Sequence, residues 1–203
     1  MQPQNPNGNP VEQHPLGFFL PENARLLMLG SFPPKRERWS MEFYYPNFQN
    51  DMWRIVGHLF FGDREHFFAS SRRAFDAGKI KAFCTEKGIA LGDTAESVIR
   101  LQDNASDKFL QVVSPLRLQQ VLPRIPRCRT LAVTGQKALE TLLELLPPVT
   151  PPATGAHVRV PFPGHPFDLY RMPSTSRAYP LPLEQKAVPY RILFRAAGIL
   201  PAE

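Results

Sequence analysis

A short apolar run that stops at a glycine and two prolines constrains the fold of this chain more than any other feature. Residues 26–29 (Leu-Leu-Met-Leu) are too few for a helix and apolar throughout, as in a parallel strand buried on both faces. Gly30-Ser31-Phe32-Pro33-Pro34 follows, and the two prolines prevent a strand or a helix from continuing. The chain must therefore leave the sheet in an irregular loop. Open α/β sheets bind ligands just beyond the carboxyl ends of their strands, so this loop is a candidate site.

The segment after this loop is rich in side chains that can stack on, or hydrogen-bond to, a flat heterocycle. These side chains are Tyr44, Tyr45, Asn47, Phe48, Gln49 and Asn50. A helical pattern begins near Asp51, so Asn50 lies at or near a helix start, where asparagine is favoured as a cap and backbone N–H groups face an acceptor. From the residues alone, a capping role and a catalytic role for Asn50 are equally supported.

Strand and helix patterns alternate along the rest of the chain. This alternation predicts an α/β three-layer sandwich, with a central, mostly parallel four-stranded sheet and helices on both faces. Strands are predicted at 89–91, 129–134 and 169–172, with an edge strand at 158–162. Helices are predicted at 51–61, 64–83, 108–122 (interrupted at Pro115), 136–146 and 182–197 (kinked or interrupted at Pro189), with a helical turn at 95–100.

The composition predicts one intracellular domain. Residues 1–15 are rich in Pro and Asn and are expected to form a disordered tail, followed by a single domain over residues 16–203. The chain shows no signal peptide and no apolar run near the roughly 20 residues that a membrane span needs. Cys84 and Cys128 form neither a disulfide framework nor a zinc motif. A cytoplasmic protein without a membrane partner is therefore expected.

The charge of the chain suits a polyanionic partner. Lys and Arg number 24 against 18 acidic residues, which gives a net charge of +6. The basic residues Lys35, Arg36 and Arg38 lie beside the first loop, whereas the other basic clusters fit ordinary solvated surfaces. Neither a GxGxxG motif nor a P-loop is present, which counts against nucleotide-dependent enzymes.

Five motifs follow one another in a characteristic order. They are the loop Gly30-Ser31-Phe32-Pro33-Pro34, the segment Tyr44-Tyr45 with Asn50 and Trp53, the strand ending in Gly92-Asp93, the strand-to-helix segment 131–138, and Met172-Pro173-Ser174-Thr175-Ser176. This order, over about residues 26–194, resembles the uracil-DNA glycosylase superfamily. The hypoxanthine-DNA glycosylase branch is the most similar, and the mismatch-specific uracil glycosylases come next.

The resemblance implies an activity. A monofunctional DNA glycosylase of this kind hydrolyses the N-glycosidic bond of a deaminated base, uracil or hypoxanthine, that is flipped out of DNA for base excision repair. It needs no metal and no other cofactor. Its partner is DNA, duplex or single-stranded, that contains the damaged base, and a monomer is expected.

The resemblance also assigns roles to individual residues. Asn50 is the catalytic amide, and Tyr45 stacks on the flipped base. The remaining substrate-binding residues are Gly30, Ser31, Phe32 and Asp93. The DNA-binding residues are Lys35 and Arg36 beside the first loop, and Ser174, Thr175, Ser176 and Arg177 in the late loop that enters the duplex.

Two departures from the family pattern keep alternatives open. Phe32 stands where many relatives have a water-orienting Asp or Asn, and Met172 stands where the most active have His. A non-catalytic nucleic-acid-binding protein of the same fold is therefore the main alternative, and a small-molecule α/β enzyme is a third. Asp93 fits a structural role somewhat better than a base-binding one. His165, in Gly164-His165-Pro166, is a weak alternative to the late-loop residues and fits a turn better.

Overall fold

The computed structural model describes residues 9–70, 73–102 and 107–201. Its strands are β1 (Val11–Gln13), β2 (Leu26–Gly30), β3 (Ile89–Asp93), β4 (Ala95–Arg100), β5 (Leu110–Pro115), β6 (Thr130–Thr134), β7 (His157–Val160) and β8 (Phe167–Met172). Its α-helices are α1 (Met52–Phe61), α2 (Ala77–Lys87), α3 (Leu118–Val121), α4 (Gln136–Leu143) and α5 (Leu183–Ala196). Short 3-10 helices are η1 (Arg36–Arg38), η2 (Asp107–Phe109) and η3 (Leu122–Arg124).

The main sheet has the strand order β3-β2-β6-β8-β7. The first four strands are parallel, and β7 joins β8 antiparallel. The predicted number of four strands was wrong, because the segment expected as an edge strand completes a mixed five-stranded sheet. In the parallel part, Gly30 pairs with Asp93, and Thr134 pairs with Met172. These registers bring the carboxyl ends of four strands to one edge of the sheet.

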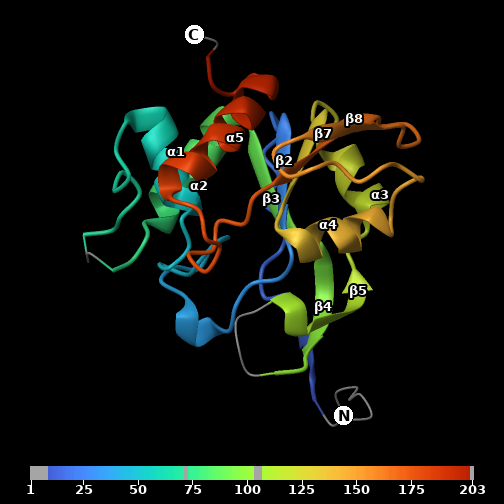
Figure 1. Cartoon of the computed structure of the whole chain (residues 1–203), viewed down its shortest axis with the longest axis horizontal. Coiled ribbons are helices and arrows are strands. Elements are labelled where there is room, and N and C mark those ends of the chain that lie inside the picture. The colour runs from blue at the N-terminus through green and yellow to red at the C-terminus, as the bar shows by residue number, and fades with distance from the viewer. Residues whose placement is uncertain (1–8, 71–72, 103–106, 202–203) are drawn as a thin grey trace.

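Helices cover both faces of this sheet, as the sequence predicted. In β2, Leu26 and Met28 point into the core under α1, α2 and α5, whereas Leu27 and Leu29 point into the core under α3 and α4. Figure 1 shows these two helical layers on opposite sides of the sheet. The continuous apolar run of β2 is therefore explained by burial on both faces.

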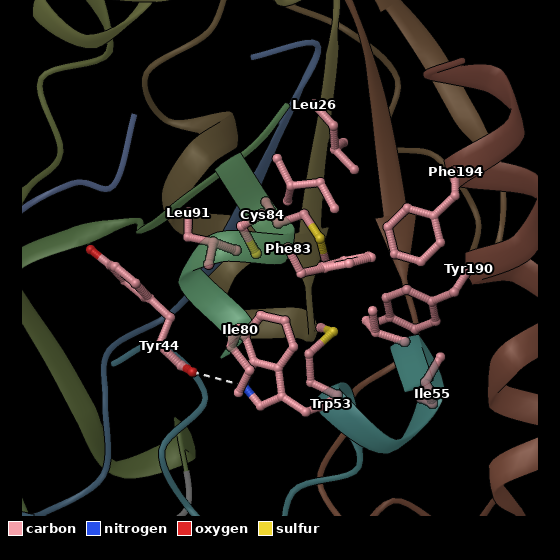
Figure 2. Close-up of a cluster of buried hydrophobic side chains, with 14 of the residues drawn as sticks. Leu26, Tyr44, Trp53, Ile55, Ile80, Phe83, Cys84, Leu91, Tyr190 and Phe194 are labelled. Atoms are coloured by element: carbon pink, nitrogen blue, oxygen red, sulfur yellow. Dashed lines mark hydrogen bonds between the residues drawn. The ribbon is translucent and has the colours of Figure 1, made fainter. Parts of the chain in front are cut away.

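The core under α1, α2 and α5 also fixes the aromatic loop at the carboxyl edge. Figure 2 shows Trp53 from α1 packed among side chains of α2 and α5. The indole Nε1 of Trp53 donates a hydrogen bond to the backbone oxygen of Tyr44 at 3.0 Å. A buried donor needs a partner, so the packing of Trp53 sets the position of the neighbouring Tyr45.

A second sheet, β1-β4-β5, is antiparallel and lies beyond the carboxyl edge of the main sheet (Figure 1). Two predictions were wrong here, because β4 replaces the helical turn at 95–100 and β5 replaces the first half of the helix at 108–122. Ala95, Val98 and Leu110 face a small core that also contains Phe32. The pairing of β4 with β5 outweighs the weak helical spacing of these segments.

The N-terminal boundary also differs from the prediction. Val11–Gln13 forms β1 and pairs with β4, so ordered structure begins before residue 16, and the tail predicted to reach residue 15 was too long. Residues 1–8 lie outside the described residues. The segment at 64–83 likewise divides into turns around Phe67 and Phe75, followed by α2, whose start is capped by the Asp76 carboxylate. Pro189 lies within α5. No helix of the described residues is long and apolar enough to cross a membrane.

Candidate functional site

A cleft of about 650 Å³ opens at the carboxyl edge of the main sheet. It is lined by residues that are far apart in the sequence but were expected to lie together. They are Gly30, Ser31, Phe32, Pro33, Pro34, Tyr45, Asn50, Asp93, Ser174, Thr175, Ser176 and Arg177. Lys35 and Arg36, which were expected to bind DNA, are not among the lining residues; Arg36 pairs with Glu42 at 2.6 Å and lies over Trp39. Arg38 takes a place in the lining instead.

Asn50 combines a capping bond with a donor that remains available. Its Oδ1 accepts a hydrogen bond from the Met52 N–H at 2.9 Å, at the start of α1. No described residue accepts a hydrogen bond from its Nδ2, and the half-buried side chain lines the cleft. The carboxylate of Asp51, the residue that precedes α1, makes no cap of its own because it pairs with cations. Both interpretations of Asn50 are therefore compatible with its geometry.

Arg54 holds the backbone of this loop from behind. Its guanidinium Nη1 donates to the backbone oxygens of Phe48 at 2.8 Å and of Asn50 at 2.9 Å. The guanidinium lies 4.4 to 5.2 Å from the ring centroids of three phenylalanines, Phe48, Phe68 and Phe75. Burial lowers the pKa of Arg54 to about 10, so the group remains charged at neutral pH. A charged donor among aromatic rings thus fixes the place of Asn50.

Tyr45 has the only positive φ (53°) among the described residues that are not glycine. This left-handed conformation is costly for a bulky residue, and such strain is often found at functional sites. Its hydroxyl lies 3.2 Å from Thr134 Oγ1, and burial raises the pKa of the phenol, which therefore stays neutral. Tyr44 belongs to the core and donates to the Gly17 oxygen at 3.0 Å. Both tyrosines border the cleft, but Tyr44 is only 4% exposed and is packed as part of the core.

Asp93 ends β3 and pairs with a histidine from the N-terminal segment. Its Oδ2 lies 2.8 Å from His14 Nε2, while His14 Nδ1 lies 2.6 Å from the Leu16 oxygen. Burial raises the pKa of Asp93, and the hydrogen bond from His14 offsets part of that rise. A β-carbon at Gly30 would collide with Asp93 Oδ1, so this strand end requires glycine. His14 was not predicted as a site residue because it lies in the segment expected to be a disordered tail.

A second carboxyl group reaches the cleft from the hairpin between β4 and β5. Ser31 Oγ donates to Asp107 Oδ2 at 2.8 Å, and both residues line the cleft. Burial raises the pKa of Asp107. Phe32 lies beside them, packed against the hairpin and edge-on to the His14 ring at a centroid distance of 5.1 Å. No sequence pattern indicated Asp107 as a site residue, because its segment was expected to border a helix.

A buried ion pair joins the late loop to the start of α1. Lys186 of α5 is only 1% exposed, and its Nζ donates to Asp51 Oδ2 at 3.1 Å and to the Ser176 oxygen at 2.8 Å. Arg177 donates to the other Asp51 oxygen at 3.2 Å and to Gln49 Oε1 at 3.0 Å. Arg177, expected to contact DNA, is therefore partly engaged in holding its own loop.

Two residues weighed from the sequence lie away from the cleft. Met172 is 2% exposed and belongs to the core. His165 is buried, and its Nε2 lies 2.6 Å from the backbone oxygen of Cys128 and 3.0 Å from Arg129 Nη1. It borders a different pocket and does not join the late-loop residues at the cleft; its backbone N–H donates to the Phe162 oxygen at 3.1 Å, as in a turn.

The cleft carries charges of both signs. Its lining contains the cationic residues Arg38, Arg100, Lys108 and Arg177 and the acidic residues Asp93 and Asp107. The acidic side chains pair with His14 and Ser31 near the sheet edge, whereas the side chains of Lys108 and Arg177 are exposed. Within the described part of the chain, no group of three His, Cys, Asp or Glu residues is placed to hold a metal ion.

Comparison with known proteins supports the fold. No protein-family model matches the sequence, and no curated protein matches it. Among solved structures, the chain is similar to a protein from Methanosarcina acetivorans whose solution NMR structure is described as that of "a putative Uracil DNA glycosylase". The TM-score is 0.61 at 21% identity, over 93% of this chain and 99% of that chain. The two proteins share a fold. This likeness agrees with the resemblance of the sequence motifs to the uracil-DNA glycosylase superfamily.

The buried ion pair generates a stability prediction. Lys186→Met should lower the free energy of unfolding by roughly 3 kcal/mol, because it leaves the Asp51 carboxylate buried with Arg177 as its remaining cation. Combining it with Asp51→Asn should cost less than the sum of the two single substitutions, by about 1 to 3 kcal/mol. Urea denaturation of the four proteins measures both quantities. Strictly additive effects would show that no interaction energy couples Lys186 and Asp51.

Proposed function

We propose that this protein is a DNA glycosylase that hydrolyses the N-glycosidic bond of a deaminated base, uracil or hypoxanthine, flipped out of DNA. The observation that carries the proposal is the single cleft that unites the first loop, Tyr45, Asn50 and the late loop at the carboxyl edge of the sheet. The fold shared with the Methanosarcina acetivorans protein supports the same class of enzyme. We further propose that the protein belongs to the uracil-DNA glycosylase superfamily, in its hypoxanthine-type branch, and that it acts in base excision repair.

The size and lining of the cleft suit an extruded nucleotide. A volume of about 650 Å³ lies in the range of small-molecule sites, roughly 300 to 1,000 Å³. Tyr45 offers an aromatic ring held by Thr134 and Trp53, and stacking on such a ring contributes roughly 1 to 3 kcal/mol per base. The first loop adds the backbone groups of residues 30–34, which can hydrogen-bond a base edge.

Asn50 is suited to stabilise the departing base. When the glycosidic bond breaks, negative charge develops on the base, and a fixed donor pointing at that charge lowers the barrier. The Nδ2 of Asn50 supplies such a donor, because its Oδ1 is occupied by the Met52 N–H. Arg54 holds the Asn50 backbone, so the donor is positioned before substrate arrives. Asn50 is therefore the proposed catalytic amide, acting on the base more directly than on water.

The proposed contact with DNA involves the exposed cations and the late loop. Ser174 and Ser176 carry hydroxyl groups that can bond phosphates, whereas Thr175 is only 2% exposed and supports the loop from within. Lys108 and Arg177 are exposed cations of the cleft lining. Lys35 and Arg36 would act further along the duplex, since they do not line the cleft. The late loop, tied to α1 through Asp51, is the candidate wedge that fills the space of the flipped nucleotide.

Oligonucleotides that carry uracil, hypoxanthine or xanthine, in single strands and in duplexes, test this proposal. Strand breaks after alkali are the expected result, because removal of a base leaves an alkali-labile abasic site. Retention of the oligonucleotide without breaks would favour a nucleic-acid-binding protein of the same fold. Neither retention nor breaks would favour a small-molecule enzyme.

Substitution of Asn50 separates catalysis from capping. Asn50→Ala should lower single-turnover excision by about 10²-fold or more, the size expected for one preorganised donor, and should cost about 1 kcal/mol of stability through the lost cap. Asn50→Asp keeps the oxygen that accepts from Met52 but removes the Nδ2 donor. It should fold with near wild-type stability and excise as poorly as Asn50→Ala. A stable Asn50→Asp protein with the wild-type rate would leave Asn50 as a cap alone.

Binding to DNA should weaken as salt rises, because phosphate contacts release counterions. Lys108→Ala should reduce the slope of log affinity against log salt by about 1, since this exposed lysine lines the cleft. Arg127→Ala is the matched control, because Arg127 is also exposed but precedes β6, at the opposite edge of the sheet. Its slope should equal that of the wild type. Binding that ignores salt would contradict a phosphate-dominated interface.

A further inference from the structure

Hydrolysis requires a polar group that accepts a hydrogen bond from the attacking water, and the first loop lacks such a side chain at the expected position. Phe32 stands in the first loop where a polar residue would orient water, and its ring is 7% exposed and packed on the hairpin. Asn50 does not replace it, because its Oδ1 already accepts from the Met52 N–H. Among the described residues that line the cleft, the acidic ones are Asp93 and Asp107, and their carboxylates are the remaining candidates.

Asp93 is poorly suited to accept a proton from water. Its Oδ2 is bonded to His14 Nε2 at 2.8 Å, and its Oδ1 packs against the backbone of Gly30. His14 Nδ1 in turn lies 2.6 Å from the Leu16 oxygen and 3.1 Å from the Leu16 nitrogen, which holds the ring in place. Because both oxygens of Asp93 face protein groups, neither is well placed to accept a proton from water.

Asp107 meets the requirement better. Its Oδ2 accepts from Ser31 Oγ at 2.8 Å, and no described residue donates to its Oδ1. Ser31 is 9% exposed and directly follows Gly30, so the serine anchors the carboxylate at the end of β2. The carboxylate thus reaches the first loop from the hairpin, although the two residues are 76 positions apart. One oxygen fixes its orientation, and the other can face the cleft.

We propose that Asp107, oriented by Ser31, is the catalytic group that positions and deprotonates the attacking water. This inference rests on the proposed glycosylase function. The bond between C1′ of the deoxyribose and the base nitrogen breaks, and the electron pair goes to the base, which Asn50 stabilises. The water oxygen bonds to C1′ and one water proton passes to Asp107. That proton returns to the base through solvent, so the products are the neutral base and an abasic site.

The groups around Asp107 set the pH range in which it can act. Burial raises its pKa, Ser31 lowers it, and the nearby charge of Asp93 raises it again. Arg100 and Lys137 oppose that rise with positive charge; Arg100 is itself held by Glu12 at 2.9 Å and by the Pro33 oxygen at 2.6 Å. Asp107 accepts a proton only when ionised. Excision should therefore fall as pH falls through this raised pKa, above the usual value of about 4.

Single-turnover excision measured against pH on the full chain tests the assignment. Asp107→Asn should reduce the plateau rate by about 10²-fold or more, as expected for loss of a general base, and should abolish the fall in rate at acidic pH. DNA affinity and thermal stability should stay close to those of the wild type. The matched control is Asp168→Asn, because Asp168 lies at the amino-terminal end of β8, away from the cleft. It should keep the wild-type profile.

Ser31→Ala supplies a second variant that leaves the carboxylate in place. Removing the hydrogen bond that favours the ionised form should move the acidic limb of the pH profile to higher pH. A wild-type rate in Asp107→Asn, or a reduced rate with the acidic limb intact, would overturn the role of Asp107 while leaving the glycosylase proposal standing. A wild-type protein that excises none of the bases would overturn both.

Discussion

The buried contact between Lys186 and Asp51 is the interaction on which the geometry of the cleft depends. Through it, α5, the late loop and the start of α1 meet at one carboxylate. The Asp51 N–H also donates to the Thr175 oxygen at 2.8 Å, so side chain and backbone of the same residue hold the late loop. Because the Asp51 carboxylate is engaged in this contact, the first N–H of α1 donates its hydrogen bond to the Asn50 side chain instead.

The opposite wall of the cleft is held by a different kind of interaction. Aromatic and cationic groups, rather than an ion pair, fix the loop that carries Tyr45 and Asn50. The strained backbone at Tyr45 costs of order 1 to 3 kcal/mol and persists because Trp53 and Thr134 hold it from both sides. The cleft is therefore formed before any ligand binds. A preformed site saves the ordering cost that a flexible loop would incur on binding.

Much of this architecture was predictable from local patterns. The apolar runs predicted β2, β3, β6 and β8. One cleft could be expected because open α/β sheets bind ligands just beyond the carboxyl ends of their parallel strands. The β4–β5 hairpin was missed because its stability lies in cross-strand pairs and not in local spacing.

The polar partners of the cleft were missed for a related reason. His14 and Asp93 are 79 positions apart, and Lys186 and Asp51 are 135 apart, so no local pattern joins them. Lys186 also follows the periodicity of an ordinary helix, in which a lysine is usually taken to be exposed. A catalytic role for Asn50 could be proposed from its motif, whereas the side chains that position this residue could be found only once the chain was folded.

The pairing of β1 with β4 has a consequence for the limits of the functional unit. From composition alone, the first fifteen residues look dispensable, and a shortened protein that starts at Leu16 would seem complete. Such a protein would lose the edge strand of the smaller sheet and, with His14, the side chain that lies 2.8 Å from the Asp93 carboxylate. The buried Asp93 carboxylate would then face the cleft without this hydrogen-bond partner, and an anionic ligand would be repelled although the core of the protein was intact. The minimal unit that can be transplanted or evolved thus begins upstream of the first core strand.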